Sequence, residues 1–167
     1  MTSAARTVRV LFLCTGNSAR SQMAEAILER VGGPRFQVES AGTEPKGVNP
    51  FTLRVLRDAG IDWSAATSKS VTQFRDQPFD FVITVCARAR QACPVFPGAD
   101  QSLHWDLEDP AEVEGSDDDR AAAFRATYAQ LGARIGGFVE MVDSPLAASV
   151  QHDDPRRPRS IKPKSRT

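Results

Sequence analysis

The feature that most constrains this chain is an apolar, β-prone run, Val8 to Leu13, that stops at a short polar loop. Such a run is typical of a strand buried in a parallel sheet. The loop comprises residues 14–18, and from Ser21 onward apolar residues recur every three or four positions, as in a helix. The N-terminal part of the chain is therefore predicted to form a strand, a loop and a helix in succession.

The same alternation continues along the chain. Further strands are predicted at residues 36–40, 79–85 and 101–104, and further helices at residues 50–59 and 118–141. Parallel strands need crossover connections, so strands that alternate with helices imply a parallel sheet. We therefore expect a single α/β domain with a four-stranded parallel sheet and helices on both faces.

Length and composition agree with one domain. The chain has 167 residues, of which 41% are hydrophobic, enough to cover a sheet with helices. We place the domain at residues 7–142, because Ser144-Pro145 interrupts the last helix. The tail, residues 143–167, is basic and proline-containing without apolar periodicity, and we predict that it is disordered.

Charge and hydropathy exclude several classes of protein. The last 17 residues hold six Lys or Arg and two Asp, which leaves 15 positive and 19 negative side chains in residues 1–150. A mildly acidic domain argues against nucleic acid as a partner. No run approaches the roughly 20 apolar residues that span a membrane, and there is no signal-peptide core. We expect a cytoplasmic protein without a membrane partner.

Cys14 begins the polar loop and Arg20 follows it, with five residues between them and Ser21 directly after Arg20. Between a strand and a helix, backbone N–H groups curl into a concave nest, and the helix N-terminus adds its positive dipole end. An arginine offers a planar fork for two oxygens. The arrangement suits a tetrahedral oxyanion, and Ser21 could donate a hydrogen bond that keeps Cys14 a reactive thiolate. The alternative is a buried cysteine beside a solvated arginine.

Asp109, which precedes Pro110, follows the last predicted strand. Ligands in such sheets bind beyond the carboxyl ends of the strands, so this loop and the Cys14 loop can share one mouth. When Cys14 displaces an oxygen from the oxyanion, a positioned carboxylic acid must protonate the leaving group. Asp109 is our candidate for that acid, although Asp-Pro alone is also a common turn signal.

Two more cysteines follow the strand at residues 79–85. Cys86 ends this strand and Cys93 lies seven residues later, before Pro94. The segment between them has helix-forming residues and no proline, so it could be helical when reduced and rearrange into a disulfide. The alternatives are two structural cysteines, or a zinc site with a histidine as the fourth ligand. We favour thiol exchange, because it explains all three sulfurs without requiring a fourth ligand.

These motifs together resemble a known family. They are Cys14 to Glu25, Glu39 to Thr43, Cys86 with Cys93-Pro94, and His104-Trp105 ahead of Asp109-Pro110. In this order they closely resemble the thioredoxin-coupled arsenate reductases, which share the fold of low-molecular-weight tyrosine phosphatases. The resemblance covers residues 7–142.

The resemblance implies a role for each site residue. Cys14 is the nucleophile, and arsenate, with phosphate as a competing anion, is held by Thr15, Gly16, Asn17, Ser18, Ala19, Arg20 and Ser21. Asp109 is the general acid. Cys86 then attacks Cys14 in the adduct and releases arsenite, Cys93 attacks the Cys14–Cys86 disulfide, and thioredoxin reduces the Cys86–Cys93 disulfide. The implied function is arsenic detoxification.

The sequence departs from the family in two places. Some members have a further cysteine where this chain has Ala19, which leaves the three-sulfur relay intact. Some bind potassium with the help of an acidic residue where this chain has Lys69, whose ammonium could replace the ion. We predict no bound metal and no other cofactor. A low-molecular-weight tyrosine phosphatase is the rival function, and a non-catalytic arsenite-binding module is a further alternative.

Overall fold

Four strands form one parallel sheet in the computed structural model, which describes residues 6–92 and 96–144. They are β1 (Val8–Cys14), β2 (Phe36–Gly42), β3 (Phe79–Thr84) and β4 (Ala99–His104). Their order across the sheet is β2-β1-β3-β4, and every neighbouring pair is parallel. The predicted four-stranded parallel sheet is confirmed.

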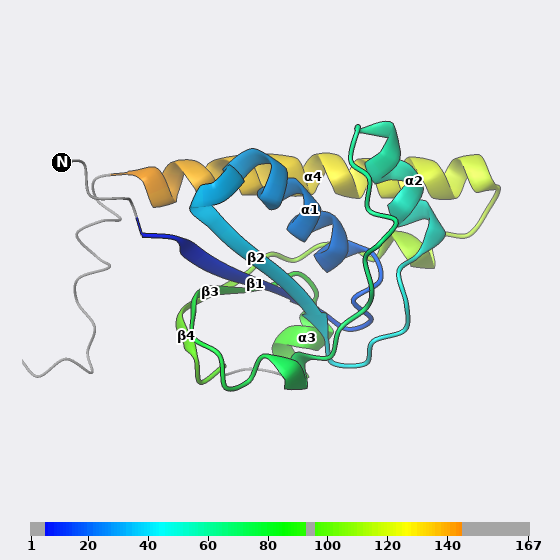
Figure 1. Cartoon of the computed structure of the whole chain (residues 1–167). Coiled ribbons are helices and arrows are strands. Elements are labelled where there is room, and N and C mark those ends of the chain that lie inside the picture. The colour runs from blue at the N-terminus through cyan, green and yellow to red at the C-terminus, as the bar shows by residue number, and fades with distance from the viewer. Residues whose placement is uncertain (1–5, 93–95, 145–167) are drawn as a thin grey trace, which may run out of the picture.

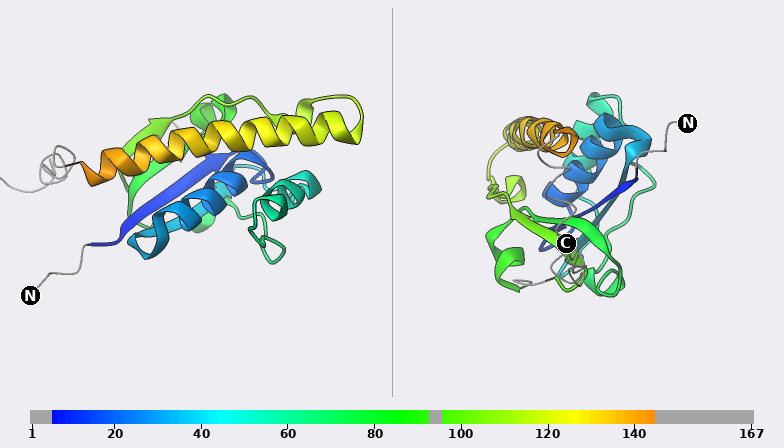
Figure 2. Two further views of the ribbon diagram at one scale, coloured as in Figure 1. Left: turned by 90° about the horizontal axis from the view of Figure 1, so that it is seen from above. Right: turned by 90° about the vertical axis from the view of Figure 1, so that its left-hand side faces the viewer.

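Helices cover both faces of this sheet, as predicted. They are α1 (Arg20–Gly32), α2 (Pro50–Asp58), α3 (Ala87–Ala92) and α4 (Asp117–Asp143). Figures 1 and 2 show α1 and the long α4 on one face, with α3 on the other. Three single 3-10 turns, which the sequence analysis did not foresee, are η1 (Gly33–Arg35), η2 (Val71–Gln73) and η3 (Pro110–Glu112).

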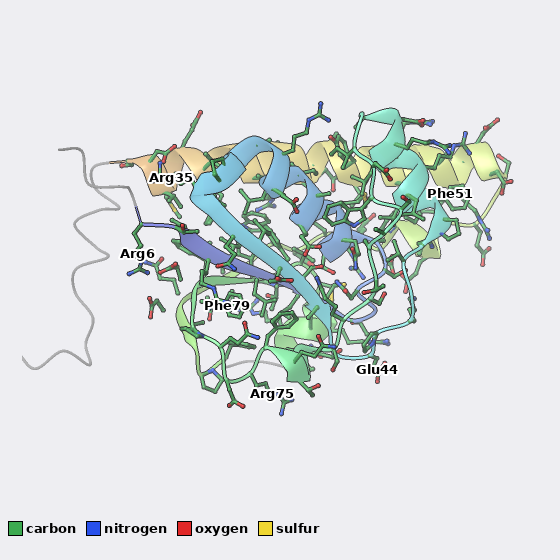
Figure 3. All side chains as sticks on the ribbon, in the orientation of Figure 1. Arg6, Arg35, Glu44, Phe51, Arg75 and Phe79 are labelled. Carbon is green, nitrogen blue, oxygen red and sulfur yellow. The ribbon has the colours of Figure 1, made fainter. Side chains whose placement is uncertain are left out.

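The strand order determines where a ligand can bind. The order reverses between β1 and β3, so the connections leave their carboxyl ends toward opposite faces and open a crevice there. Figure 3 shows Glu44, which follows β2, at this end of the molecule, and Arg35, which precedes β2, at the opposite end. The segments after β1, β3 and β4 all begin at the crevice.

The core between the sheet and α4 is built around an aromatic cluster. Phe138 of α4 is buried, and its ring centroid lies 4.9 Å from that of Phe81, 6.1 Å from Phe36 and 6.2 Å from Trp105. These partners come from β3, β2 and the segment after β4. One side chain of α4 therefore packs the helix against three separate segments of the sheet layer.

Some predictions concern residues outside the described part of the chain. Cys93 is one of them, and so is nearly all of the predicted disordered tail at residues 143–167. Over residues 6–92 and 96–144, no helix combines the length and the apolar character needed to cross a lipid bilayer.

Replacing Phe138 with alanine should lower the free energy of unfolding by about 3–5 kcal/mol, because it removes a buried ring and leaves a cavity among three aromatic partners. Urea unfolding measures this loss. Val31→Ala is the matched control, because the Val31 side chain is 57% exposed and its truncation should change stability by about 0.5 kcal/mol or less. Similar losses in both variants would contradict this account of the core.

Candidate active site

The carboxyl ends of the strands bring four predicted site residues to one cavity of about 330 Å³. Cys14, Arg20, Cys86 and Asp109 all line it. Of the predicted substrate-binding residues, Thr15, Gly16, Ser18 and Ala19 also line the cavity. Asn17 and Ser21 are fully buried. Their side chains form the support of the loop rather than its surface.

The loop after β1 presents its backbone N–H groups to the cavity because its carbonyls are all bound on the outside. Each carbonyl from Cys14 to Ser18 accepts a hydrogen bond from beyond the loop, at donor–acceptor distances between 2.7 and 3.2 Å. The donors are the backbone N–H groups of Thr43, Glu44, Lys46 and Asn49 and the side chains of Gln22, Thr52 and Ser68. In a trans peptide N–H and C=O point in opposite directions, so the amides face inward, toward an anion.

Gly42 lets the loop lie this close to β2. A Cβ atom at Gly42 would stand 2.5 Å from the Thr15 carbonyl oxygen and 2.8 Å from the Asn17 nitrogen. Both are backbone atoms and cannot swing away. The absence of a side chain at the end of β2 is therefore a condition for the anion loop.

The sulfur of Cys14 lies among hydrogen-bond donors. Its Sγ accepts from the Asn17 backbone N–H at 3.1 Å and lies 2.8 Å from Ser21 Oγ. Ser21 Oγ already accepts from Asn17 Nδ2 at 2.8 Å, which leaves its own proton for Cys14. Two donors thus stabilise a thiolate at Cys14, and the thiol is free.

Arg20 is the first residue of α1 and is held in place by the loop after β4. Its NH1 donates to the Leu107 carbonyl at 3.0 Å, and its NH2 lies 3.4 Å from Asp109 Oδ2. The other carboxylate oxygen of Asp109 accepts from the Ala111 N–H at 3.0 Å. The guanidinium and the carboxyl group are therefore fixed together at the cavity wall, where an oxyanion and its leaving group would lie.

Cys86 follows β3 and is the second free thiol of the cavity. It is buried, with its Sγ 3.5 Å from Thr15 Oγ1 of the anion loop and 3.4 Å from the Ala89 N–H in α3. Both groups can donate to a thiolate. Because β1 and β3 are neighbours, Cys14 at the end of β1 and Cys86 just after β3 line the same cavity.

A partly buried cluster of one lysine and two glutamates supports the loop from behind. Lys69 Nζ lies 3.1 Å from Glu25 Oε1 and 3.0 Å from Glu39 Oε2, so an ammonium already occupies the place between these carboxylates. Burial raises the pKa of Glu25, and Lys69 opposes that rise without cancelling it. Burial lowers the pKa of Lys69, but Glu25 and Glu39 outweigh it and the net pKa is raised. These residues do not favour a bound monovalent cation.

The sequence analysis missed two basic residues of the cavity wall. Lys46 and Arg88 both line the cavity, where they add positive charge beside Arg20. Lys46 lies over Gly16 and donates its backbone N–H to the Gly16 carbonyl at 3.0 Å. Arg88 lies two residues after Cys86, and this closeness in sequence could have predicted its place in the cavity wall. Lys46 carried none, because a lysine in a polar loop is ordinary.

Comparison with known proteins agrees with this geometry. The family model for low molecular weight phosphotyrosine protein phosphatase matches residues 9–148. The chain belongs to this family.

The relatives narrow the class further. An arsenate reductase of Halalkalibacterium halodurans is 42% identical over 131 residues, which cover 78% of this chain and 94% of the relative. A solved structure, an arsenate reductase in the phosphate binding state, has a TM-score of 0.70 at 30% identity and covers 81% of this chain and 99% of its own. A thioredoxin-dependent arsenate reductase of Corynebacterium glutamicum has a TM-score of 0.66 at 29% identity, with 84% and 64% covered. Within the family, the chain belongs with the arsenate reductases.

Lys69→Met should destabilise the protein, and more strongly as the pH rises. The variant leaves Glu25 buried without its cation, a penalty that grows as Glu25 ionises and shrinks as it takes up a proton at low pH. We expect a loss of about 1–3 kcal/mol near neutral pH, less than for a fully buried pair, because the Lys69 side chain is 24% exposed.

Urea unfolding at about pH 7.5 and about pH 4.5 measures the loss of unfolding free energy at each pH. Lys69→Arg keeps the charge and should lose less at the higher pH. A loss for Lys69→Met that is the same at both pH values would show that Glu25 does not carry the effect.

Proposed function

We propose that this protein reduces arsenate to arsenite, with Cys14 as the nucleophile and Cys86 as the thiol that resolves the adduct. The observation that carries the proposal is the second buried, free thiol in the wall of an oxyanion cavity. Hydrolysis of a phosphate ester needs only a nucleophile, a clamp and an acid. Reduction needs two electrons, which a second thiol provides by forming a disulfide.

The steps balance with the residues of the cavity. The Cys14 thiolate attacks arsenic while Arg20 and the loop amides hold the oxygens, and Asp109 donates a proton so that one oxygen leaves as water. The Cys86 thiolate then attacks Cys14 Sγ. The electron pair of the sulfur–arsenic bond passes to arsenic, which leaves as arsenite, and a Cys14–Cys86 disulfide remains.

The residues that line the cavity favour a small inorganic oxyanion over a phosphotyrosine. No aromatic side chain lines it among the residues that the structure describes. After Asp109-Pro110, where phosphatases of this fold often carry tyrosines, Ala111 and Glu112 form the wall. The single tyrosine of the chain, Tyr128, lies in α4. A weak phosphatase activity remains the second candidate, because Cys14, Arg20 and Asp109 are sufficient for it.

Regeneration of the enzyme is proposed to run through Cys93 to thioredoxin. Cys93 follows the last residue of α3 and lies outside the described residues. Its thiol would attack Cys86, free Cys14 and leave a Cys86–Cys93 disulfide for the reductant. The thioredoxin-dependent relative from Corynebacterium glutamicum supports this donor. We further propose a cytoplasmic location, where three cysteines stay reduced between turnovers. We also propose that the domain ends near residue 142.

Asp109→Asn should slow the first chemical step by about 10²–10⁴-fold, because the amide cannot give up a proton to the leaving oxygen. Arsenate should still bind, since Arg20 and the loop amides are unchanged. Single-turnover formation of arsenite measures the step. Asp106→Asn, which alters another carboxylate of the same cavity, is the control and should leave the rate nearly unchanged. Equal rates in Asp109→Asn and the unaltered protein would assign the proton to another group.

Cys86→Ser should separate two activities. Arsenite release should stop, because no thiol remains to attack Cys14, while hydrolysis of a small aryl phosphate should continue. Both activities are measured on one preparation, with Cys14→Ser, which should lose both, as the control. Equal loss of both in a folded Cys86→Ser protein would leave the phosphatase as the better function.

Cys93→Ser completes the test of the relay. One equivalent of arsenite should form, after which the enzyme should stall with a Cys14–Cys86 disulfide that peptide mass mapping detects. Sustained turnover with thioredoxin in this variant would remove Cys93 from the pathway.

A further inference from the structure

Trp63 is connected to the active site by hydrogen bonds, although it does not line the cavity. It lies between α2 and η2, partly buried, with its ring packed against the core. Its indole Nε1 donates a hydrogen bond of 2.8 Å to Gln22 Oε1. Gln22 is a fully buried residue in the first turn of α1. A polar side chain there needs a complete set of partners.

The indole determines which way the amide of Gln22 points. An indole N–H can only donate, so the atom of Gln22 that faces it must be the oxygen. The Nε2 group therefore faces away from Trp63, toward three acceptors. They are Asn17 Oδ1 at 2.9 Å, the Thr67 carbonyl at 3.1 Å and the Asn17 carbonyl at 3.2 Å. With the amide reversed, an oxygen would face three oxygens.

The same polarity continues from Gln22 to the nucleophile. Asn17 Oδ1 accepts from Gln22 and from the Lys69 N–H, so Asn17 Nδ2 is directed at Ser21 Oγ, and the proton of Ser21 is directed at Cys14 Sγ. The Asn17 carbonyl accepts from Gln22 and from Ser68 Oγ, and these bonds hold Asn17 in a left-handed conformation with a φ of 46°. In this conformation the Asn17 N–H donates to Cys14 Sγ.

We propose that Trp63 is a positioning residue for the nucleophile. Through Gln22 it contributes two of the hydrogen bonds that hold Asn17, and Asn17 in turn aims both hydrogen-bond donors at the Cys14 sulfur. The proposal rests on the function above in that Cys14 acts as a thiolate, but its test reads the sulfur directly and does not require arsenate. Loss of the indole N–H should leave the Cys14 sulfur less reactive toward an electrophile near neutral pH while the fold persists.

The test uses the full chain with Cys86→Ser and Cys93→Ser, which leaves Cys14 as the remaining one of three cysteines. In this background Trp63→Phe keeps an aromatic ring and removes the N–H group. Alkylation of Cys14 by iodoacetamide is followed by mass spectrometry from about pH 5 to about pH 9. We expect the rate near pH 6.5 to fall about three- to tenfold, the effect of one ordinary hydrogen bond, and to converge at high pH.

Two further variants identify the route. Gln22→Met removes the amide that links Trp63 to Asn17 and should slow alkylation at least as much as Trp63→Phe. Adding Trp63→Phe to Gln22→Met should have no further effect on the rate, because both changes act through the same hydrogen bonds. The control is Trp105→Phe at the other tryptophan, which packs against Phe12 and Phe138. It should lower the melting temperature without moving the pH profile of alkylation.

The possible results separate the two proposals. A lower melting temperature for Trp63→Phe with an unchanged pH profile would reduce Trp63 to a packing residue and overturn the positioning role. An unchanged profile for Gln22→Met would overturn it independently, even if Trp63→Phe failed to fold. A Cys14 that reacts like a free thiol before any change at Trp63 would instead count against the nucleophile itself.

Discussion

The buried amide of Asn17 is the interaction on which the rest of the active site depends. It is fully buried and holds the left-handed turn of the loop, so each of its polar atoms must find a partner inside the protein. Its Oδ1 accepts from Gln22 and from the Lys69 N–H, and its Nδ2 donates to Ser21 and to Ser40. These partners come from α1, β2 and the segment before η2. The loop can therefore take its shape only when these parts of the fold are assembled.

The surface of the loop that faces the anion consists mostly of backbone N–H groups. Donors outside the loop bind its carbonyls, above all the N–H groups of residues 43–49, and the amides are thereby turned inward before any ligand arrives. Gly42 permits the close approach, and α1 begins at Arg20 without a side-chain cap from Ala19. Free amides at a helix N-terminus suit an oxyanion. The groups that face the anion are backbone amides, and buried side chains behind the loop hold it in this shape.

Much of this could be predicted from the sequence, and the boundary has a physical reason. The strands and helices follow from apolar periodicity, and the shared cavity of Cys14, Cys86 and Asp109 follows because parallel strands have their carboxyl ends at one edge. The hydrogen bonds that support the loop from more distant parts of the chain were not predictable. Trp63 lies 41 residues from Gln22 in the chain, and neither residue carries a local pattern that reveals a hydrogen bond between them. Contacts of this kind depend on the assembled fold.

The strand order also explains why Cys86, the proposed resolving thiol, follows β3. β1, which ends at Cys14, has two neighbours in the described sheet, β2 and β3. The end of β2 is occupied, since Gly42 must stay without a side chain and the residues after it bind the loop carbonyls. β4 is one strand farther away, and the segment after it carries Asp109, the proposed acid. The end of β3 is thus the neighbouring position that can offer Cys86 to Cys14 without dismantling the anion site, so a second thiol there adds reduction to an oxyanion-binding fold.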